Sequence, residues 1–114
     1  MSIESTNVEK VIAELYSREE AYKAACEKLA DAEYAYKTDL AVKFNEAEGT
    51  VDNRKNSALI ACKAKYEAYL KAEAVKDYTK EMLKDAQQVL SARQSLLSAS
   101  VRSDNAYANT TGAR

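Results

Sequence analysis

Basic and aromatic side chains gather on both sides of a single internal glycine, Gly49. Lysine and arginine neutralise phosphates while aromatic rings stack on unpaired bases, so this combination is typical of surfaces that bind single-stranded nucleic acid. The candidate nucleic-acid-binding residues are Lys37, Lys43, Arg54, Lys55, Lys63, Lys65, Tyr66 and Tyr69. The alternative is that the tyrosines lie at the edge of a helical core and that the lysines, with glutamates beside them, are simply solvated.

The residue types that most catalytic and metal sites need are missing from the sequence. The chain has no histidine, which is the usual general base near neutral pH and a common zinc ligand. Its two cysteines are not arranged as CxxC, and the glycine-rich phosphate-binding and nucleophile-elbow motifs are absent. The sequence therefore predicts a protein that is not an enzyme and that uses no metal and no cofactor.

The elements that position the basic cluster are predicted from spacing and from the scarcity of helix breakers. The chain has no proline and only two glycines. Apolar residues recur every three or four positions on both sides of Gly49, as on one face of an α-helix. We predict a helix over 6–48, a turn over 49–51 and a helix over 52–102, with a frayed segment at 1–5 and a disordered tail at 103–114. The fold class is all-α, a long antiparallel helical hairpin of coiled-coil type.

Cap signals support the predicted ends of the helices. Thr6 and Glu9 form a possible capping box at the start of the first helix. Gly49 suits a helix end with a positive φ angle, and Thr50 or Asp52 can cap the next helix. A second capping box at Ser17 leaves a break possible there, but the apolar stripe continues across it in phase, which favours one helix.

A hairpin that turns at Gly49 places residues opposite each other when their numbers add up to about 100. Leu40 then faces Ile60, Leu29 faces Leu70 and Tyr22 faces Tyr78. Cys26 and Cys62 are separated by ~18 Å along the axis. A disulfide within one chain is therefore excluded, and both are expected to be reduced, half-buried residues.

Two adjacent apolar rows along 75–101 form a face too wide for one partner helix. A lone hairpin would leave this face in water, so the sequence predicts a homo-oligomer, a helical bundle or ring of several copies. The candidate interface residues are Val75, Met82, Leu83, Val89, Leu90, Leu96, Leu97 and Val101.

Charge is shared unevenly between the two halves of the chain. Residues 1–49 carry 11 acidic and 6 basic side chains, a balance of −5, and residues 50–114 carry 7 acidic and 11 basic ones, a balance of +4. Two interpretations are open: the halves attract each other, or the second half meets an anion such as nucleic acid. No apolar run is long enough for a membrane span, and no signal-peptide pattern opens the chain, so no membrane partner and a cytoplasmic location are expected.

Three segments together resemble small helical proteins of tailed bacteriophages. They are Ala-Glu-Gly-Thr-Val-Asp-Asn-Arg-Lys (47–55), Ala-Lys-Tyr-Glu-Ala-Tyr-Leu-Lys-Ala (64–72) and Leu-Ser-Ala-Arg-Gln-Ser-Leu-Leu (90–97). Their order is similar to the layout of the UvsY family of recombination mediators. The resemblance implies a ring-shaped helical oligomer that binds single-stranded DNA and helps to load a recombinase, in the cytoplasm of the host cell. The family's basic, aromatic-flanked helix matches either 37–44 or 63–69, and this chain lacks the family's more basic balance.

Three hypotheses follow from these patterns. The first is an oligomeric phage accessory protein that binds single-stranded DNA at the basic end of the hairpin. The second is a protein-interaction module, such as an inhibitor of a host enzyme or defence system, whose partner is a host or phage protein. This hypothesis depends on the apolar face of 52–102 and on the acidic 6–48 segment. The third is a scaffold in virion assembly.

Overall fold

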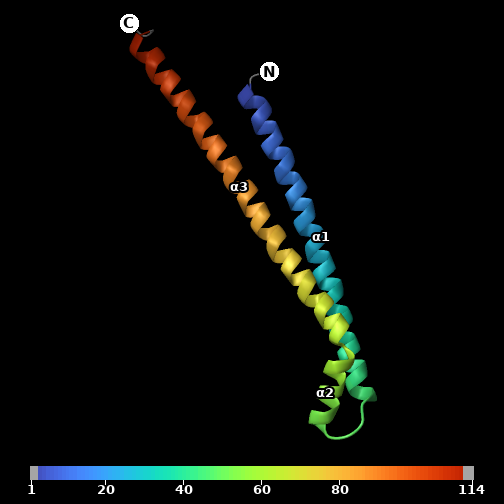
Figure 1. Ribbon diagram of the computed structural model, residues 1–114. Coiled ribbons are helices and arrows are strands. Elements are labelled where there is room, and N and C mark those ends of the chain that lie inside the picture. Colours follow the sequence, from blue (N-terminus) through green and yellow to red (C-terminus); the bar gives the residue numbers. More distant parts are fainter. Residues whose placement is uncertain (1–2, 112–114) are drawn as a thin grey trace. The chain divides into compact units, whose positions relative to one another are not determined.

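The computed structural model contains three helices: α1 (Ile3–Glu46), α2 (Val51–Ala61) and α3 (Lys63–Thr111) (Figure 1). It describes the backbone of residues 3–111 and the side chains of residues 7–103. No strand occurs within 3–111. The predicted all-α class and helical hairpin are confirmed, and α1 runs through Ser17 without a break.

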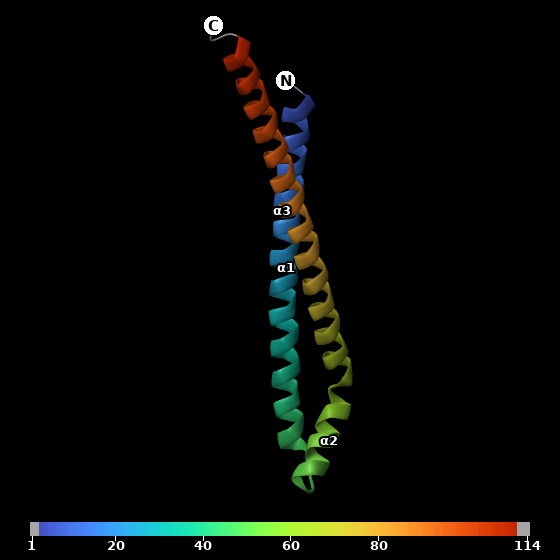
Figure 2. The ribbon, with the colours of Figure 1, turned by 90° about the vertical axis from the view of Figure 1, so that its left-hand side faces the viewer.

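The helices form two compact units. Unit 1 comprises the chain ends, Met1–Glu19 with Met82–Arg114, and unit 2 comprises Glu20–Glu81. In unit 2, α2 and the beginning of α3 lie beside the second half of α1 (Figures 1 and 2). In unit 1, the last part of α3 extends beyond the first turn of α1 in both views. The candidate DNA-binding residues all belong to unit 2.

The connection between α1 and α2 is set by one glycine and one threonine. Gly49 has a φ angle of 108°, a conformation that residues with a side chain rarely adopt. Thr50 is the N-cap of α2, and its hydroxyl accepts a 3.2 Å hydrogen bond from the amide of Asn53. The predicted positive φ at Gly49 is confirmed, and of the two caps predicted, Thr50 and Asp52, the structure has Thr50. Each of the two residues, Gly49 and Thr50, supplies what a helix end requires.

Both ends of the hairpin are more helical than the sequence predicts. The first helix begins at Ile3 rather than at Thr6, so the frayed segment predicted at 1–5 is wrong for 3–5. The last helix continues to Thr111, so the disordered tail predicted from 103 is wrong over 103–111. No proline or glycine interrupts the chain between Gly49 and Gly112, and alanines at positions 106 and 108 favour the helix. Residues 1–2 and 112–114 lie outside the described residues.

The predicted single helix over 52–102 is also wrong, because it is divided at Cys62. Cys62 ends α2 with φ −99° and ψ 13°, and its amide donates to the carbonyl oxygens of both Ala58 and Ile60. The amide of Tyr66 donates to the carbonyl oxygen of Cys62 at 2.9 Å, which starts α3. The interruption is therefore one residue long, and no glycine or proline announces it.

The antiparallel register agrees with the sequence prediction in each unit. In unit 1, Arg18 reaches Met82, and in unit 2, Phe44 contacts Arg54. The residue numbers of these pairs add up to 100 and 98. The expected pairing of Leu40 with Ile60 is wrong, because the Ile60 side chain is 77% exposed. Ala58 and Cys62 occupy the inner face of α2, and Ile60, two residues from each, points away from it.

Small residues occupy the positions where the helices approach each other. The buried apolar residues within the described range are Ala25, Ala58, Cys62 and Ala86, exposed by 1% to 6%. Cys62 was expected to be half-buried and is fully buried, whereas Cys26 is half-buried. Both thiols are free, as predicted. Because alanine adds little apolar area, the described core contributes less burial than leucine at the same positions would.

Many large apolar side chains remain in contact with water. Of the candidate interface residues, Met82, Leu83 and Leu90 are half-buried, and the other five are exposed: Val75, Val89, Leu96, Leu97 and Val101. Leu70 and Tyr78, the expected partners of Leu29 and Tyr22, are 44% and 65% exposed. The large side chains therefore lie at the edges of the helix pairing rather than inside it.

Candidate nucleic-acid interface

Unit 2 brings the candidate basic residues to the end of the hairpin next to the turn. Lys37 and Lys43 lie on α1, Arg54 and Lys55 on α2, and Lys63 and Lys65 at the start of α3. Each is held by a regular helix, so its position follows from the backbone register. Whether these side chains can bind an anion depends on the ion pairs and hydrogen bonds that they already form within the protein.

The Arg54 side chain contacts Phe44, close to the turn. Its Nε donates a 3.2 Å hydrogen bond to the main-chain carbonyl oxygen of Phe44, and its guanidinium carbon lies 4.4 Å from the centre of the Phe44 ring. A cation over an aromatic face is attracted by the electrons of the ring. This contact satisfies a carbonyl in the last turn of α1, which has no partner further along the helix. Arg54 thus joins α2 to α1, a role that the sequence did not reveal.

Three of the lysines form ion pairs with carboxylates of α1. The Nζ–carboxylate distances are 2.6 Å for Lys37–Glu33, 3.8 Å for Lys43–Glu46 and 3.5 Å for Lys65–Asp39. The hydrogen bond that Lys37 donates to the Glu33 carboxylate raises the pKa of Lys37, which keeps it charged. Exposed pairs of this kind are weak and exchange readily with other anions. A phosphate can therefore compete for these lysines, although the carboxylates lower the net positive charge of the surface.

Lys55 and Lys63 are exposed, and neither forms an ion pair with any residue that the structure describes. No described carboxylate forms an ion pair that would neutralise their charge. They are consequently the strongest candidates for contacts with phosphate at this end of the molecule.

Three tyrosines form an aromatic cluster across the hairpin. The ring centre of Tyr36 lies 5.2 Å from that of Tyr66, tilted by 41°, and 5.9 Å from that of Tyr69, nearly stacked at 22°. These are favourable distances for aromatic pairs. Tyr66 is 42% exposed, so part of its ring is available to a ligand. The charge of Glu33 raises the pKa of Tyr69, so its hydroxyl stays protonated at neutral pH.

A groove of about 380 Å³ lies between α1 and α2, and we call it the turn-side groove. Its lining residues are Lys37, Leu40, Ala41, Phe44, Asn45, Lys55, Ala58 and Leu59. The lining is largely apolar, with one aromatic ring, one amide and two ammonium groups. Such a surface can accept a flat apolar ring and hold an anionic group beside it. Of the predicted residues, Lys37 and Lys55 belong to this groove.

The interruption at Cys62 has a polar partner that sequence reasoning missed. The Cys62 thiol donates a hydrogen bond to Asp39 Oδ2 at 3.3 Å, and Lys65 Nζ lies 3.5 Å from the same oxygen. Burial raises the pKa of the Cys62 thiol, and the hydrogen bond from this thiol lowers the pKa of Asp39. The hairpin register, which places Asp39 opposite 61, was the one signal that could have suggested this contact.

The described residues contain neither a group suited to a metal ion nor a membrane-spanning helix. Within the residues described, no group of three or more cysteine, aspartate or glutamate side chains is placed to hold a metal ion. None of the described helices combines the length and the apolar character needed to cross a bilayer.

Comparisons with known proteins identify no relatives. No protein-family model matches the chain. Searches of curated proteins and of solved structures also found no significant match.

Proposed function

We propose that this protein is a non-enzymatic accessory protein that binds single-stranded DNA through unit 2, next to the turn. The observation that carries the proposal is the turn-side groove, in which Lys37 and Lys55 line the same surface as Phe44. An unpaired base can contact the apolar floor while the lysines contact the phosphates on either side. The resemblance in layout to recombination mediators supports the same class of ligand.

Lys63 and Tyr66 extend this surface onto α3. Lys63 is exposed without an ion pair to a described residue, and the Tyr66 ring is 42% exposed. A strand that leaves the groove can meet a second cation and a second ring here. One copy supplies few unpaired cations, so strong binding requires several copies acting together on one strand.

Fluorescence anisotropy with a labelled oligothymidylate tests the proposal directly. We expect binding at about 50 mM salt that weakens steeply towards about 200 mM, because phosphate contacts release counterions. The double variant Lys55→Glu with Lys63→Glu should lose about tenfold or more in affinity, since both phosphate contacts become repulsive.

Lys80→Glu is the matched control. Lys80 is exposed on α3 of unit 2, seventeen residues beyond Lys63, and each substitution there changes charge by the same amount. Each charge reversal in the double variant should therefore cost more affinity than Lys80→Glu does. An equal loss per substitution, or the absence of binding at low salt, would refute a DNA site at the turn.

A protein partner is the second candidate, and the exposed apolar residues of α3 favour it. Leu96 is 71% exposed and shares α3 with the exposed Val89 and Val101, and exposed apolar side chains that gather on one surface are typical of a site of protein contact. Retention of a host protein by the wild type but not by a Leu96→Glu, Leu97→Glu variant would support this function. Equal retention by both would exclude α3 as the docking surface.

A further inference from the structure

The last part of α3 carries two parallel apolar seams that differ in exposure. The inner seam consists of Leu83, Ala86, Leu90 and Leu97, of which the first three are buried or half-buried. The outer seam consists of Met82, Asp85, Val89, Ala92, Leu96 and Ala99, and from Asp85 onward all of its members are exposed. Its spacing alternates three and four residues, which is the repeat of helices that pair along their length.

The outer seam borders two grooves against α1 within unit 1. One, of about 200 Å³, is lined by Val11 of α1 and by Val89. The other, of about 120 Å³, is lined by Val8 of α1 and by Leu96. A helix laid along the seam would therefore contact both α1 and α3. The site has the form of a groove between two helices, which a third helix can fill.

We propose that the occupant is the outer seam of a second copy of this chain, running antiparallel to the first. In this register Val89 lies opposite Ala99 of the second copy, and Leu96 lies opposite Ala92 of the second copy. Both pairs of numbers add up to 188, so one alignment satisfies both contacts. Each layer then combines one large and one small side chain, which fills the space evenly.

Charge supports the same direction. The antiparallel alignment brings Asp85 opposite Ser103 of the second copy and next to its Arg102, and the symmetric contact occurs twice. The structure gives Asp85 and Arg102 no ion pair with any described residue. A parallel pairing would instead place Asp85 against Asp85 of the second copy, with like charges repelling inside the seam. It would also stack Leu96 on Leu96 and Ala92 on Ala92, leaving the alanine layers underfilled.

Arg93 opposes the pairing. It lies close to the two-fold axis of the antiparallel alignment, so it approaches Arg93 of the second copy. This repulsion lowers the affinity between the two copies. Arg93→Gln should therefore strengthen the association while leaving the seam intact. In a parallel pair the two-fold axis would run along the helices, and the two Arg93 side chains would lie on opposite sides of the seam. The same substitution would then not strengthen the association.

Sedimentation velocity on the full chain measures the association. The protein concentration is varied from about 1 to 100 µM, because a seam of three heptads is short and should associate weakly. We expect the wild type to form a dimer or a multiple of it, and Leu96→Glu to sediment as a monomer with unchanged helicity. Ile60→Glu is the matched control, because Ile60 is 77% exposed and Leu96 71% exposed, and Ile60 belongs to unit 2. Ile60→Glu should associate as the wild type does.

Cysteine cross-linking tests the direction. Mixed Ala99→Cys and Val89→Cys chains should form a disulfide between 99 and 89 under mild oxidation, identified by peptide mass spectrometry. Ala99→Cys alone should not form one between 99 and 99, because the antiparallel register separates these positions by ~15 Å. A dominant 99–99 disulfide would show a parallel pair and overturn the proposal.

Two other results would also overturn it: a monomeric wild type at the highest concentration, and association that Leu96→Glu leaves intact. A wild type that is monomeric by itself, and whose seam is covered by a different protein, would overturn the proposal in the same way as any monomeric wild type. The seam shares no residue with the turn-side groove. Loss of DNA binding in the Lys55, Lys63 variant with association retained, or the reverse in Leu96→Glu, therefore separates failure of this inference from failure of the proposed function.

Discussion

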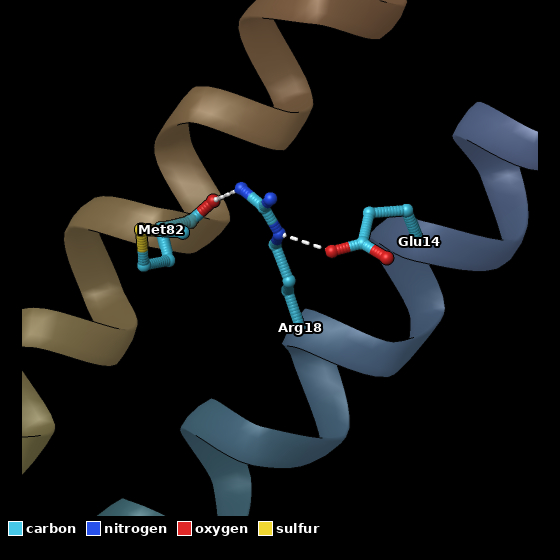
Figure 3. Close-up of polar contacts among 3 residues, drawn as sticks. All are labelled: Glu14, Arg18 and Met82. Carbon is cyan, nitrogen blue, oxygen red and sulfur yellow. Dashed lines mark hydrogen bonds and ion pairs between the residues drawn. The ribbon is translucent and has the colours of Figure 1, made fainter.

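The main-chain carbonyl oxygen of Met82 accepts a 2.7 Å hydrogen bond from Nη1 of Arg18, across the hairpin in unit 1 (Figure 3). Nε of the same guanidinium pairs with Glu14 at 2.7 Å, one helical turn earlier on α1. One side chain thus joins α1 to α3 and is itself oriented by a neighbour. Its donor geometry is fixed by the planar guanidinium, which lysine cannot reproduce.

Replacing Arg18 with methionine should lower the free energy of unfolding by about 1 kcal/mol, because a charged hydrogen bond between the helices is lost while the aliphatic contact remains. Urea denaturation followed by circular dichroism measures the change, at one fixed protein concentration because association adds stability. Glu14→Gln should cost less, since the exposed pair only orients Arg18. A larger loss for Glu14→Gln than for Arg18→Met would contradict the assignment.

Close approach of the helices at small residues predicts that size matters at Ala25 and not beside it. Ala25 is 3% exposed, whereas its neighbour Ala24 is exposed on the same helix. Ala25→Leu should destabilise the protein by about 1 to 3 kcal/mol, because the extra methyl groups force the helices apart. Ala24→Leu changes the helix propensity by the same amount as Ala25→Leu and should leave the free energy of unfolding nearly unchanged. Equal melting temperatures for the two variants would mean that the helices do not pack at this position.

The turn should be sensitive to backbone conformation rather than to crowding. A Cβ added at Gly49 would meet Asn53 Cβ at 3.5 Å, an ordinary contact, but the φ angle of 108° is unfavourable for any residue with a side chain. Gly49→Ala should therefore cost about 1 kcal/mol. Gly49→Asn, which tolerates positive φ better, should cost less than Gly49→Ala in the same thermal melts. A cost for asparagine equal to that for alanine would argue against this conformation.

Loss of the Thr50 cap should cost a similar amount. Thr50→Ala removes the acceptor of the Asn53 amide and should lower the free energy of unfolding by about 1 kcal/mol. Thr38→Ala is the control, because Thr38 is exposed in the interior of α1. Chemical denaturation distinguishes the two, and an equal effect would indicate that the cap contributes nothing beyond helix propensity.

The contact between Cys62 and Asp39 predicts that the stability of the fold decreases both at high pH and at low pH. Burial raises the pKa of the Cys62 thiol, so folding favours the protonated form, and its contribution is complete below the pKa of the unfolded state. It is lost as pH rises through the pKa of the folded state. The pKa of Asp39 is lowered by the thiol hydrogen bond, so its contribution is present above the unfolded pKa and is lost as pH falls through the folded pKa.

Between pH 7 and about pH 10, the wild type should therefore lose more stability than Cys62→Ala, since only the wild type must ionise a buried thiol. Urea midpoints at both pH values provide the measurement. Parallel curves for Cys62→Ala and the wild type would show that the thiol is not the titrating group.

The hairpin and its turn could be predicted because they follow from local chemistry. Helix periodicity, the absence of proline, and the neighbouring Gly49 and Thr50 each act within a few residues. The register within each unit followed from the position of the turn, because residues of antiparallel helices lie opposite each other when they are equally far from their connection. The candidate lysines were likewise brought to one end of the hairpin by chain topology, as expected.

What each of those side chains does was decided only by tertiary structure. The same periodicity allowed Ile60 or Ala58 to face α1, and the small residue did, because close helix approach favours it. Arg54 on Phe44, Lys65 on Asp39 and the thiol of Cys62 on the same carboxylate depend on partners 10 to 26 residues away in the chain. Sequence spacing on one helix carries no information about such partners. The amino-acid sequence by itself therefore determined the helical hairpin and its register, and the packing between the helices decided which charges are paired within the protein.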